Sequence, residues 1–190
     1  MSIEKLVLQN RSYRAFDESA PITAEVMREL VDLARKTPSG MNKQPLRYRI
    51  LCEKDDVATM TKSCRFAMKL GIPLPPEGQN PTGFILMFID REAGSPQSLA
   101  LKDAGIAAQT ILLAAAEKGF GGCMLGSFNP QTVCETYNIP DRFEPVLAIA
   151  LGKPAEQVVL VEAKDGSLDY YRDENGTHCV PKRTLDEVLI

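Results

Sequence analysis

Hydrophobic positions recur at helical spacing over residues 24–36, in the first third of the chain. Thr23 stands directly before them as a suitable N-cap, and Pro38 follows the last of them. We therefore predict a helix that begins after Thr23 and ends before Pro38. Its predicted buried face consists of Val26, Leu30 and Leu33, with Met27, Val31 and Ala34 beside them.

Short segments rich in apolar residues predict strands at residues 48–51, 83–89 and 146–151. The second of these is apolar throughout, which is typical of a strand in the middle of a sheet. Residues 71–81 hold four prolines and are therefore predicted to form a mobile loop near the mouth of a substrate site.

A long helical pattern covers residues 98–118, and Gly119 is placed to end it. From residue 106 to residue 116 the pattern is apolar nearly all round the helix. Such a helix must be covered on every side. It is therefore expected in the middle of the core or at a subunit interface.

Local signals near the end of the chain predict three further elements. Asn129 followed by Pro130 favours a short helix up to Tyr137, and Asn175-Gly176 favours a hairpin between residues 170–171 and 179–180. Residues 184–187 read as a capping box for a last short helix. That helix would begin directly after Lys182 and Arg183, where its dipole favours an anion. We predict one domain over residues 1–190.

Composition excludes several classes of protein and leaves the rest open. A net charge of −3 gives no electrostatic footprint for nucleic acid. No apolar run reaches the length that spans a bilayer, and the first residues lack the layout of a secretory signal, so we expect a cytoplasmic protein without a membrane partner. Five cysteines without a Cys-x-x-Cys pair predict reduced thiols, neither disulfides nor zinc. The single histidine, His178, reads as a strand or loop residue that cannot form a metal site alone, with contact to a cofactor phosphate as the alternative.

Two short segments are dense in hydrogen-bond donors. Residues 11–14 offer the guanidiniums of Arg11 and Arg14 and the hydroxyl of Ser12, which suit a phosphate group. Residues 38–45 form a polar turn in which the amides of Asn42 and Gln44 can read the edge of a heterocycle. The alternatives are solvated surface charge for the first segment and a helix-ending turn for the second.

The two segments together form the series Arg-Ser-x-Arg-x-Phe and, after the first helix, Pro-Ser-x-x-Asn-x-Gln-Pro. In this order the chain resembles the flavin-dependent nitroreductase family. Later segments extend the resemblance over essentially the whole chain: residues 103–109 in the long helix, residues 121–126 after it, and residues 180–183.

The resemblance implies an α+β fold, a central mixed sheet flanked by helices, in a homodimer with two FMN sites at its interface. Arg11, Ser12 and Arg14, with Lys182 and Arg183, would bind the FMN phosphate. The turn would contact the isoalloxazine and ribityl groups of the flavin bound by the other subunit, through Pro38, Ser39, Gly40, Asn42 and Gln44. The backbone near the ring atom that accepts hydride would come from Met124, Leu125, Gly126 and Ser127.

Three further residues have weaker assignments. Asp103 and Gln109 on the long helix are interpreted as structural. Arg65 is the candidate for a basic side chain near the flavin pyrimidine, although Lys62 and Lys69 are predicted on the same helix.

The function implied is an FMN-dependent NAD(P)H oxidoreductase that reduces a small nitroaromatic, quinone or enone acceptor by ping-pong hydride transfer. Because the cofactor performs the hydride chemistry, no catalytic side chain or metal is expected. Dehalogenation and flavin breakdown on the same scaffold stay open. So do a flavin-binding or regulatory protein with little turnover and a structural α/β domain. The sequence names neither the physiological acceptor nor the preferred nicotinamide cofactor.

Overall fold

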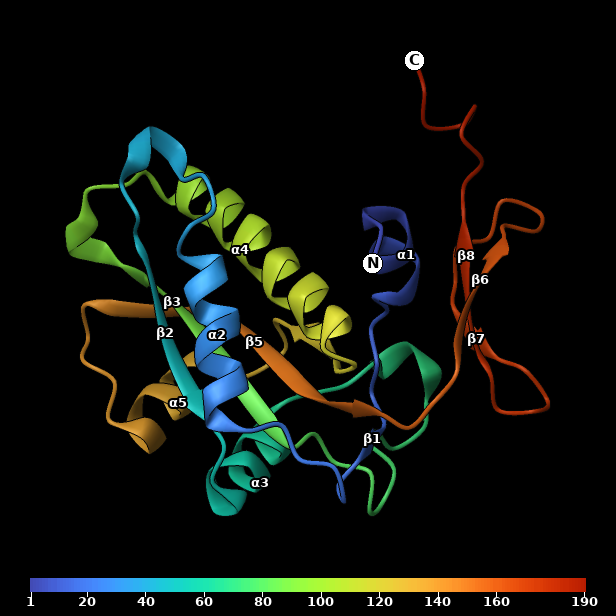
Figure 1. Cartoon of the computed structure of the whole chain (residues 1–190), viewed down its shortest axis with the longest axis horizontal. Helices are drawn as coiled ribbons and strands as arrows, with labels where there is room; N and C mark the ends of the chain where they lie inside the picture. The colour runs from blue at the N-terminus through green and yellow to red at the C-terminus, as the bar shows by residue number, and fades with distance from the viewer.

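The computed structural model describes residues 1–190, and it contains five α-helices and two β-sheets (Figure 1). The helices are α1 (Ile3–Gln9), α2 (Ala24–Ala34), α3 (Lys54–Ser63), α4 (Gln97–Glu117) and α5 (Pro130–Tyr137). The larger sheet consists of β1 (Phe16–Asp17), β2 (Leu46–Leu51), β3 (Gly83–Asp90), β4 (Gly121–Leu125) and β5 (Phe143–Pro154). The smaller sheet consists of β6 (Val158–Glu162), β7 (Tyr171–Arg172) and β8 (His178–Lys182). Three 3₁₀ turns complete the chain: η1 (Gly40–Asn42), η2 (Met68–Leu70) and η3 (Arg91–Ala93).

Strand β5 organises the larger sheet, because β1, β3 and β4 all pair with it. Strand β2 pairs with β3 and forms an edge. These pairs are antiparallel, whereas Ser12 forms a parallel bridge with Gly122 of β4, and β6 pairs in parallel with β8. The predicted α+β fold with a mixed sheet flanked by helices is confirmed.

Both faces of the larger sheet are covered, because β3 alternates its side chains between two hydrophobic cores. Phe84, Leu86 and Phe88 pack into the core that includes residues of α3 and α5. Ile85 and Met87 pack into the core that includes residues of α2 and α4. Every residue of β3 is buried. The continuous apolar run thus correctly predicted a central strand.

Helix α2 begins as predicted, since the Thr23 hydroxyl accepts the N–H of Val26 at 3.2 Å. Its buried residues are Met27, Leu30 and Ala34. Leu33 is 42% exposed, so its prediction as part of the buried face is wrong. Successive residues of a helix are about 100° apart around its axis. Leu33 therefore lies about 100° from the buried Ala34, at the edge of the apolar face.

Helix α4 is the longest helix and lies beside α2 (Figure 1). It is long and apolar enough to cross a membrane, with a mean hydropathy of 1.4 over an 18-residue window, and 56% of that window is buried in the structure. The sequence prediction concerned uninterrupted apolar runs, and these stay short in α4 because Lys102, Asp103, Gln109 and Thr110 interrupt them. The helix reaches this mean hydropathy through its many separate alanine, isoleucine and leucine residues. Ile106 remains 44% exposed, so one chain does not cover the apolar half of α4 completely.

Other local predictions are confirmed. Gly119 follows α4 with a positive φ of +80°. The Asn129 side chain caps α5 by accepting the N–H of Thr132 at 3.1 Å. The turn that contains Gly176 joins the antiparallel pair β7 and β8. Residues 71–81 contain neither helix nor strand, as predicted.

The predicted last helix is absent. Thr184 and Glu187 do exchange the capping-box hydrogen bonds, since the N–H of Thr184 donates to Oε2 of Glu187 at 2.8 Å and the N–H of Glu187 donates to Oγ1 of Thr184 at 3.4 Å. Residues 186–188 nevertheless form only a turn. So short a segment does not recover the cost of helix nucleation without packing, and Leu185, Val188 and Leu189 are exposed.

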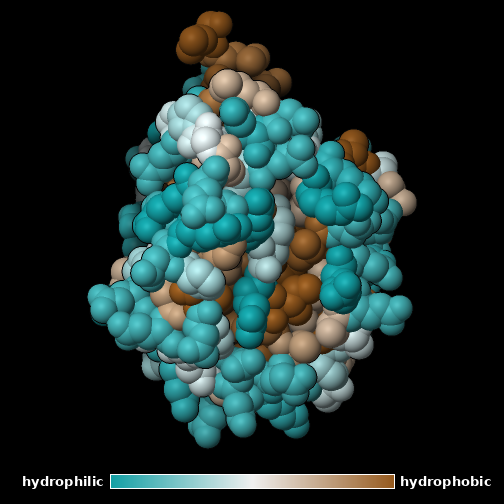
Figure 2. All heavy atoms as spheres, turned by 90° about the vertical axis from the view of Figure 1, so that its left-hand side faces the viewer, coloured by the Kyte–Doolittle hydropathy of each residue, from teal (hydrophilic) through white to brown (hydrophobic).

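The two termini and the β2 edge leave apolar side chains uncovered. Helix α1, at the start of the chain, lies beside α4, and none of its residues is buried (Figure 1). The view from the β2 side shows polar side chains around a hollow with hydrophobic atoms in it (Figure 2). A hollow between α2 and β2 is lined in part by Val31, Leu33, Tyr48 and Ile50.

Candidate functional site

Residues 11–14 form an extended segment that lies against β4. Ser12 forms its bridge with Gly122, and Tyr13 donates its N–H to the Gly122 carbonyl at 3.0 Å. The neighbouring Gly121 permits this approach, because a Cβ at that position would lie 2.5 Å from the Tyr13 ring. The glycine pair after the long helix therefore allows the first donor-rich segment to dock.

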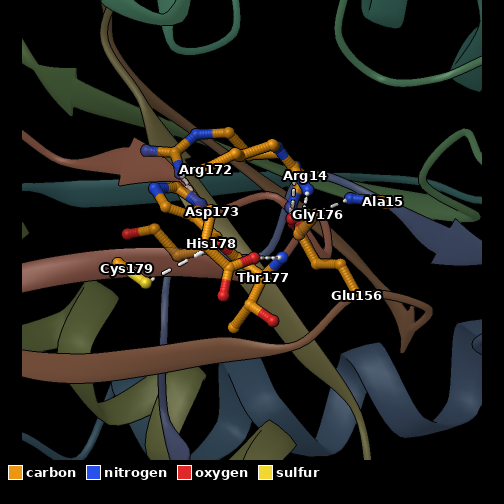
Figure 3. Close-up of polar contacts among 10 residues, drawn as sticks. Arg14, Ala15, Glu156, Arg172, Asp173, Gly176, Thr177, His178 and Cys179 are labelled. Atoms are coloured by element: carbon orange, nitrogen blue, oxygen red, sulfur yellow. Dashed lines mark hydrogen bonds and ion pairs between the residues drawn. The ribbon is translucent and has the colours of Figure 1, made fainter.

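A buried carboxylate, Glu156, holds the other side of this segment (Figure 3). Its side chain is 5% exposed. One carboxylate oxygen accepts the backbone N–H groups of Arg14 and Ala15, and the other accepts Nη2 of Arg172 at 2.6 Å. Sequence reasoning missed Glu156, Arg172 and the neighbouring Tyr170, because single residues in or beside such short strands give no periodic signal. The predicted hairpin beside Tyr170 was the only pointer to this region.

Arg14 has no carboxylate partner for its side chain. Its Nη1 donates to the Ser12 carbonyl at 3.1 Å and lies 3.5 Å from Nδ1 of His178. Its guanidinium carbon lies 5.4 Å from the centre of the Tyr170 ring, within the range of a cation–π contact. Its Nε is buried and has no hydrogen-bond partner. The positive charge of Arg14 is therefore held in place but not neutralised by a salt bridge.

Arg11 also lacks a carboxylate partner. Its side chain donates to the carbonyls of Asn10 at 2.6 Å and Val7 at 2.5 Å. These carbonyls lie at the C-terminal end of α1, where a cation is favourable. Arg11 thus ends α1 and keeps its positive charge available to the adjoining cavity.

A cavity of 420 Å³, here called the basic cavity, brings the predicted phosphate-binding residues together. Arg11, Ser12, Arg14 and Lys182 all line it, and so does His178. Its lining includes three cationic side chains and no aspartate or glutamate. An uncompensated group of cations in a cavity favours an anionic ligand.

Arg183 lies outside the basic cavity. Its side chain is half exposed, and its nearest carboxylate is Glu187 at 3.9 Å. Because no helix follows residue 183, the predicted helix dipole does not contribute to an anion site either. The structure therefore separates Lys182 from Arg183.

A second cavity of 370 Å³, here called the β4 cavity, continues from the first, because Arg14, Met124 and Tyr170 line both. Its wall includes Met124, Leu125, Gly126 and Ser127, the predicted flavin-ring segment at the end of β4. Residues 71–81 line neither cavity, which argues against their predicted place near a substrate mouth.

Arg65 lines the β4 cavity and donates its backbone N–H to the Ser127 carbonyl at 2.9 Å. The prediction that Lys62, Arg65 and Lys69 share a helix is wrong. Helix α3 ends at Ser63, because Cys64 turns to an extended conformation and bridges Phe128. Lys69 lies on η2, where it forms a 2.7 Å salt bridge with Asp169.

The polar turn of residues 38–44 has an unusual backbone. Met41, Asn42 and Gln44 have φ values of 53°, 53° and 46°, a left-handed conformation that is rare outside glycine. The side-chain amides of Asn42 and Gln44 are exposed and make no hydrogen bond within the chain. Strained backbone with unused polar groups is typical of a binding site.

Asp103 of α4 holds this turn. The carboxylate is buried and accepts the Ser39 hydroxyl at 2.8 Å and the Gly40 N–H at 3.0 Å. The same Ser39 oxygen accepts the N–H of Gln44 at 3.0 Å. Asp103 is thus structural, as predicted, and Ser39 and Gly40 connect it to the exposed amides.

Within one chain the turn and the basic cavity are separate. The turn contacts α4 at Asp103, whereas Gln109 and Leu112 of the same helix line the basic cavity. Leu112 is nine residues further along, which places it about 14 Å up the helix and on its opposite side. Neither cavity contains a residue of the turn.

Burial keeps the cysteines of this region protonated. It raises the pKa of Cys64 to about 12, and it also raises the pKa of Cys123. Neither thiol is therefore an activated nucleophile at neutral pH. His178 is a buried strand residue on β8, consistent with the simpler interpretation of the single histidine.

Comparison with known proteins gives relatives over most of the chain. The Bacillus subtilis protein named "Putative NAD(P)H nitroreductase YodC" is 27% identical over 177 residues, covering 77% of this chain and 88% of that protein. A crystal structure of "a putative nitroreductase in complex with FMN" from Desulfovibrio desulfuricans has a TM-score of 0.74 and 24% identity, covering 100% of this chain and 96% of that one. A nitroreductase family protein from Streptococcus pneumoniae TIGR4 has a TM-score of 0.71 and 18% identity, covering 100% of this chain and 99% of that one.

The structural likenesses establish the fold, and the sequence match establishes the family. The model of the Nitroreductase family matches residues 7–73 and 76–153, which include the basic segment, the polar turn, α4 and β4. The chain belongs to the Nitroreductase family.

Proposed function

We propose that this chain is an FMN-dependent oxidoreductase that takes hydride from NADH or NADPH and delivers it to a small electrophilic acceptor. Family membership supports this reaction class, and the FMN complex of a structural neighbour supports the cofactor. The observation that carries the proposal is the basic cavity, in which three cationic side chains face no carboxylate. A phosphate supplies the missing negative charge.

The residues of the basic cavity fit the phosphate of FMN. Arg14 and Arg11 are both held by contacts to neutral groups, so their charges are available to an anion. Ser12 adds an exposed hydroxyl, and Lys182 adds a third cation. We assign phosphate binding to these four residues and leave Arg183 out, since it lies outside the cavity.

The β4 cavity fits the ring of the flavin, which supplies the hydride donor and acceptor chemistry when it is bound. Residues 124–127 form the wall that would lie against the ring. Arg65 adds positive charge beside Ser127, where it would stabilise negative charge on the reduced ring. The chain's own residues bind and orient, and none is required as a nucleophile.

The polar turn completes the site from a second copy of the chain. In one chain it lies apart from both cavities, yet its two amides have no partner. Exposed apolar residues on α1 and α4, including Val7 and Ile106, offer surface for the homodimer that would bring the turn to the other subunit's flavin. The site is therefore composite, with Arg14 from one subunit and Asn42 and Gln44 from the other.

We propose an acceptor of nitroaromatic, quinone or enone type. Nucleic acid and membrane are not partners in this proposal, and the reaction takes place in the cytoplasm, where NADH and NADPH are available.

The visible absorbance of the purified chain, followed by mixing with NADH or NADPH, tests the proposal. We expect bound FMN that bleaches rapidly and regains its colour when menadione or a nitroaromatic compound is added. Flavin that binds but stays oxidised would instead identify a flavin-binding or regulatory protein. A colourless chain that binds no added flavin would overturn the proposal.

A further inference from the structure

The buried side chains behind Arg14 contain an unusual concentration of unpaired nitrogen atoms. Three buried side-chain nitrogens in the chain lack a hydrogen-bond partner: Nε of Arg14, Nε of Arg172 and Nε2 of His178. All three belong to the cluster around Glu156 (Figure 3). Buried unpaired polar atoms are costly, so their gathering beside the basic cavity indicates a functional arrangement.

His178 contacts both Arg14 and Tyr170, and these two side chains also contact each other. Its side chain is 1% exposed, and its Nδ1 lies 3.5 Å from Nη1 of Arg14. Its ring centre lies 5.3 Å from that of Tyr170, with 54° between the ring planes. Since Arg14 also lies over Tyr170, the three side chains form one contact group.

The surroundings keep the imidazole neutral. Burial lowers the pKa of His178 below its ordinary value of 6.5, and the nearby guanidiniums of Arg14 and Arg172 lower it further, while Glu156 opposes them. The other side chain that faces the ring is that of Tyr170. A neutral imidazole has one nitrogen that donates and one that accepts. The contact with Arg14, which can only donate, assigns the accepting role to Nδ1.

We infer that His178 is a positioning residue for Arg14, whose guanidinium it holds at the wall of the basic cavity through its accepting Nδ1. This inference rests on the proposed function, because the ligand that Arg14 would meet there is the phosphate of FMN. The contact is long, so its expected contribution is smaller than that of Arg14 itself. The residue acts through Arg14 and does not touch the reacting atoms.

Two amide variants of His178 separate this role from simple packing. Asparagine places its carbonyl oxygen near the position of Nδ1, whereas glutamine places its oxygen near Nε2. We expect His178→Gln to weaken FMN binding by roughly three- to tenfold, the range of one weak hydrogen bond, while riboflavin binding stays within about twofold. His178→Asn should restore most of the FMN affinity. Both affinities are measured by flavin fluorescence with the full chain, and melting temperatures confirm that each variant folds.

Nitrogen-15 NMR of the histidine ring gives a second readout that does not depend on flavin binding. Since the chain has a single histidine, its two ring nitrogens are assigned without ambiguity. We expect a neutral ring with the proton on Nε2 at pH 7. A proton on Nδ1, or a charged ring, would overturn the inference.

Three binding results would contradict the role of His178 or the phosphate assignment on which it rests. Equal losses of FMN and riboflavin in His178→Gln would indicate a packing role, and equal effects of asparagine and glutamine would exclude the Nδ1 contact. A wild-type chain that binds FMN no more tightly than riboflavin would overturn the phosphate assignment itself. That failure of the proposed function is distinguishable from a failure of the His178 inference, because it would appear in the wild-type chain before any substitution is made.

Discussion

The basic cavity and the polar turn are built in opposite ways. Around the cavity, Arg14 is held by residues from distant parts of the chain, since Ser12 lies on the N-terminal segment while Tyr170 and His178 belong to the C-terminal sheet region. In the turn, residues 39–44 are held by one buried carboxylate, Asp103, and the side-chain amides of Asn42 and Gln44 stay exposed. The basic cavity is therefore built on charged side chains that are packed together, whereas the polar turn presents its side-chain amides to solvent.

This difference teaches that the two halves of the candidate site have different sensitivities. Damage to the charge group should affect stability and phosphate recognition together, because its members are buried and share partners. Damage to the exposed amides should affect flavin binding with little loss of stability.

The largest effect on stability is expected for Glu156→Gln. An amide at this position places an N–H group against Arg172 or against the backbone N–H groups of Arg14 and Ala15, and in either orientation the half-buried Arg172 loses its charged partner. We expect a loss of about 3 kcal/mol in the free energy of unfolding, measured with urea. The exposed pair of Lys69 and Asp169 is the control, since water screens this pair and Asp169→Asn should leave the free energy of unfolding nearly unchanged. Equal losses in the two variants would contradict the contrast.

Arg14→Ala should reduce FMN affinity by about 2 kcal/mol, roughly thirtyfold, because a charge-assisted contact to phosphate is lost. Riboflavin, which lacks the phosphate, should bind with nearly unchanged affinity. Isothermal titration with both flavins measures the difference. The phosphate assignment fails if both flavins lose affinity equally.

Replacement of both turn amides, in Asn42→Gly with Gln44→Gly, should weaken FMN and riboflavin equally, by about tenfold, because ring contacts do not distinguish the two. Glycine tolerates the positive φ of these positions, so the backbone conformation is retained. Met41→Gly, at φ 53°, is the matched control without loss of an amide. A selective loss of FMN would place the turn at the phosphate instead.

The smallest effect concerns pH. Because the folded state lowers the pKa of His178, the unfolded chain binds more protons as pH falls below about 6.5, and stability decreases in that direction. We expect the melting temperature of the flavin-free chain to fall by a few degrees at most between pH 7 and pH 5.5. In His178→Asn, which has no histidine left, this decrease should be smaller. An unchanged decrease would assign it to other groups.

The sequence predicted the fold well where local signals and burial agree. The run of residues 83–89 gave a central strand, and Thr23, Asn129 and Gly119 marked helix ends correctly. The capping box at Thr184 was misleading, because a helix signal without packing does not make a helix. Leu33 was placed wrongly, because the width of a buried face depends on neighbours that the sequence does not show.

The candidate site likewise contains residues that the sequence predicted and residues that it did not. Arg11, Ser12, Arg14 and Lys182 share a cavity, as their donor chemistry suggested. Glu156 and Tyr170, which hold Arg14, could not be found, because their contacts join segments more than 140 residues apart in the chain. Long-range charge partners leave no spacing pattern within a single sequence.

Complementation between subunits tests the shared site most directly. Chains with Arg14→Ala are mixed with chains that carry Asn42→Gly and Gln44→Gly, and the heterodimer is isolated with two different affinity tags. One of its two sites then combines the intact arginine with the intact turn, while the other carries both defects. The account predicts wild-type FMN affinity at one site per heterodimer, and NAD(P)H oxidation at FMN concentrations too low to fill the sites of either parent. A heterodimer that binds FMN no better than its parents, or a monomer that retains flavin, would contradict it.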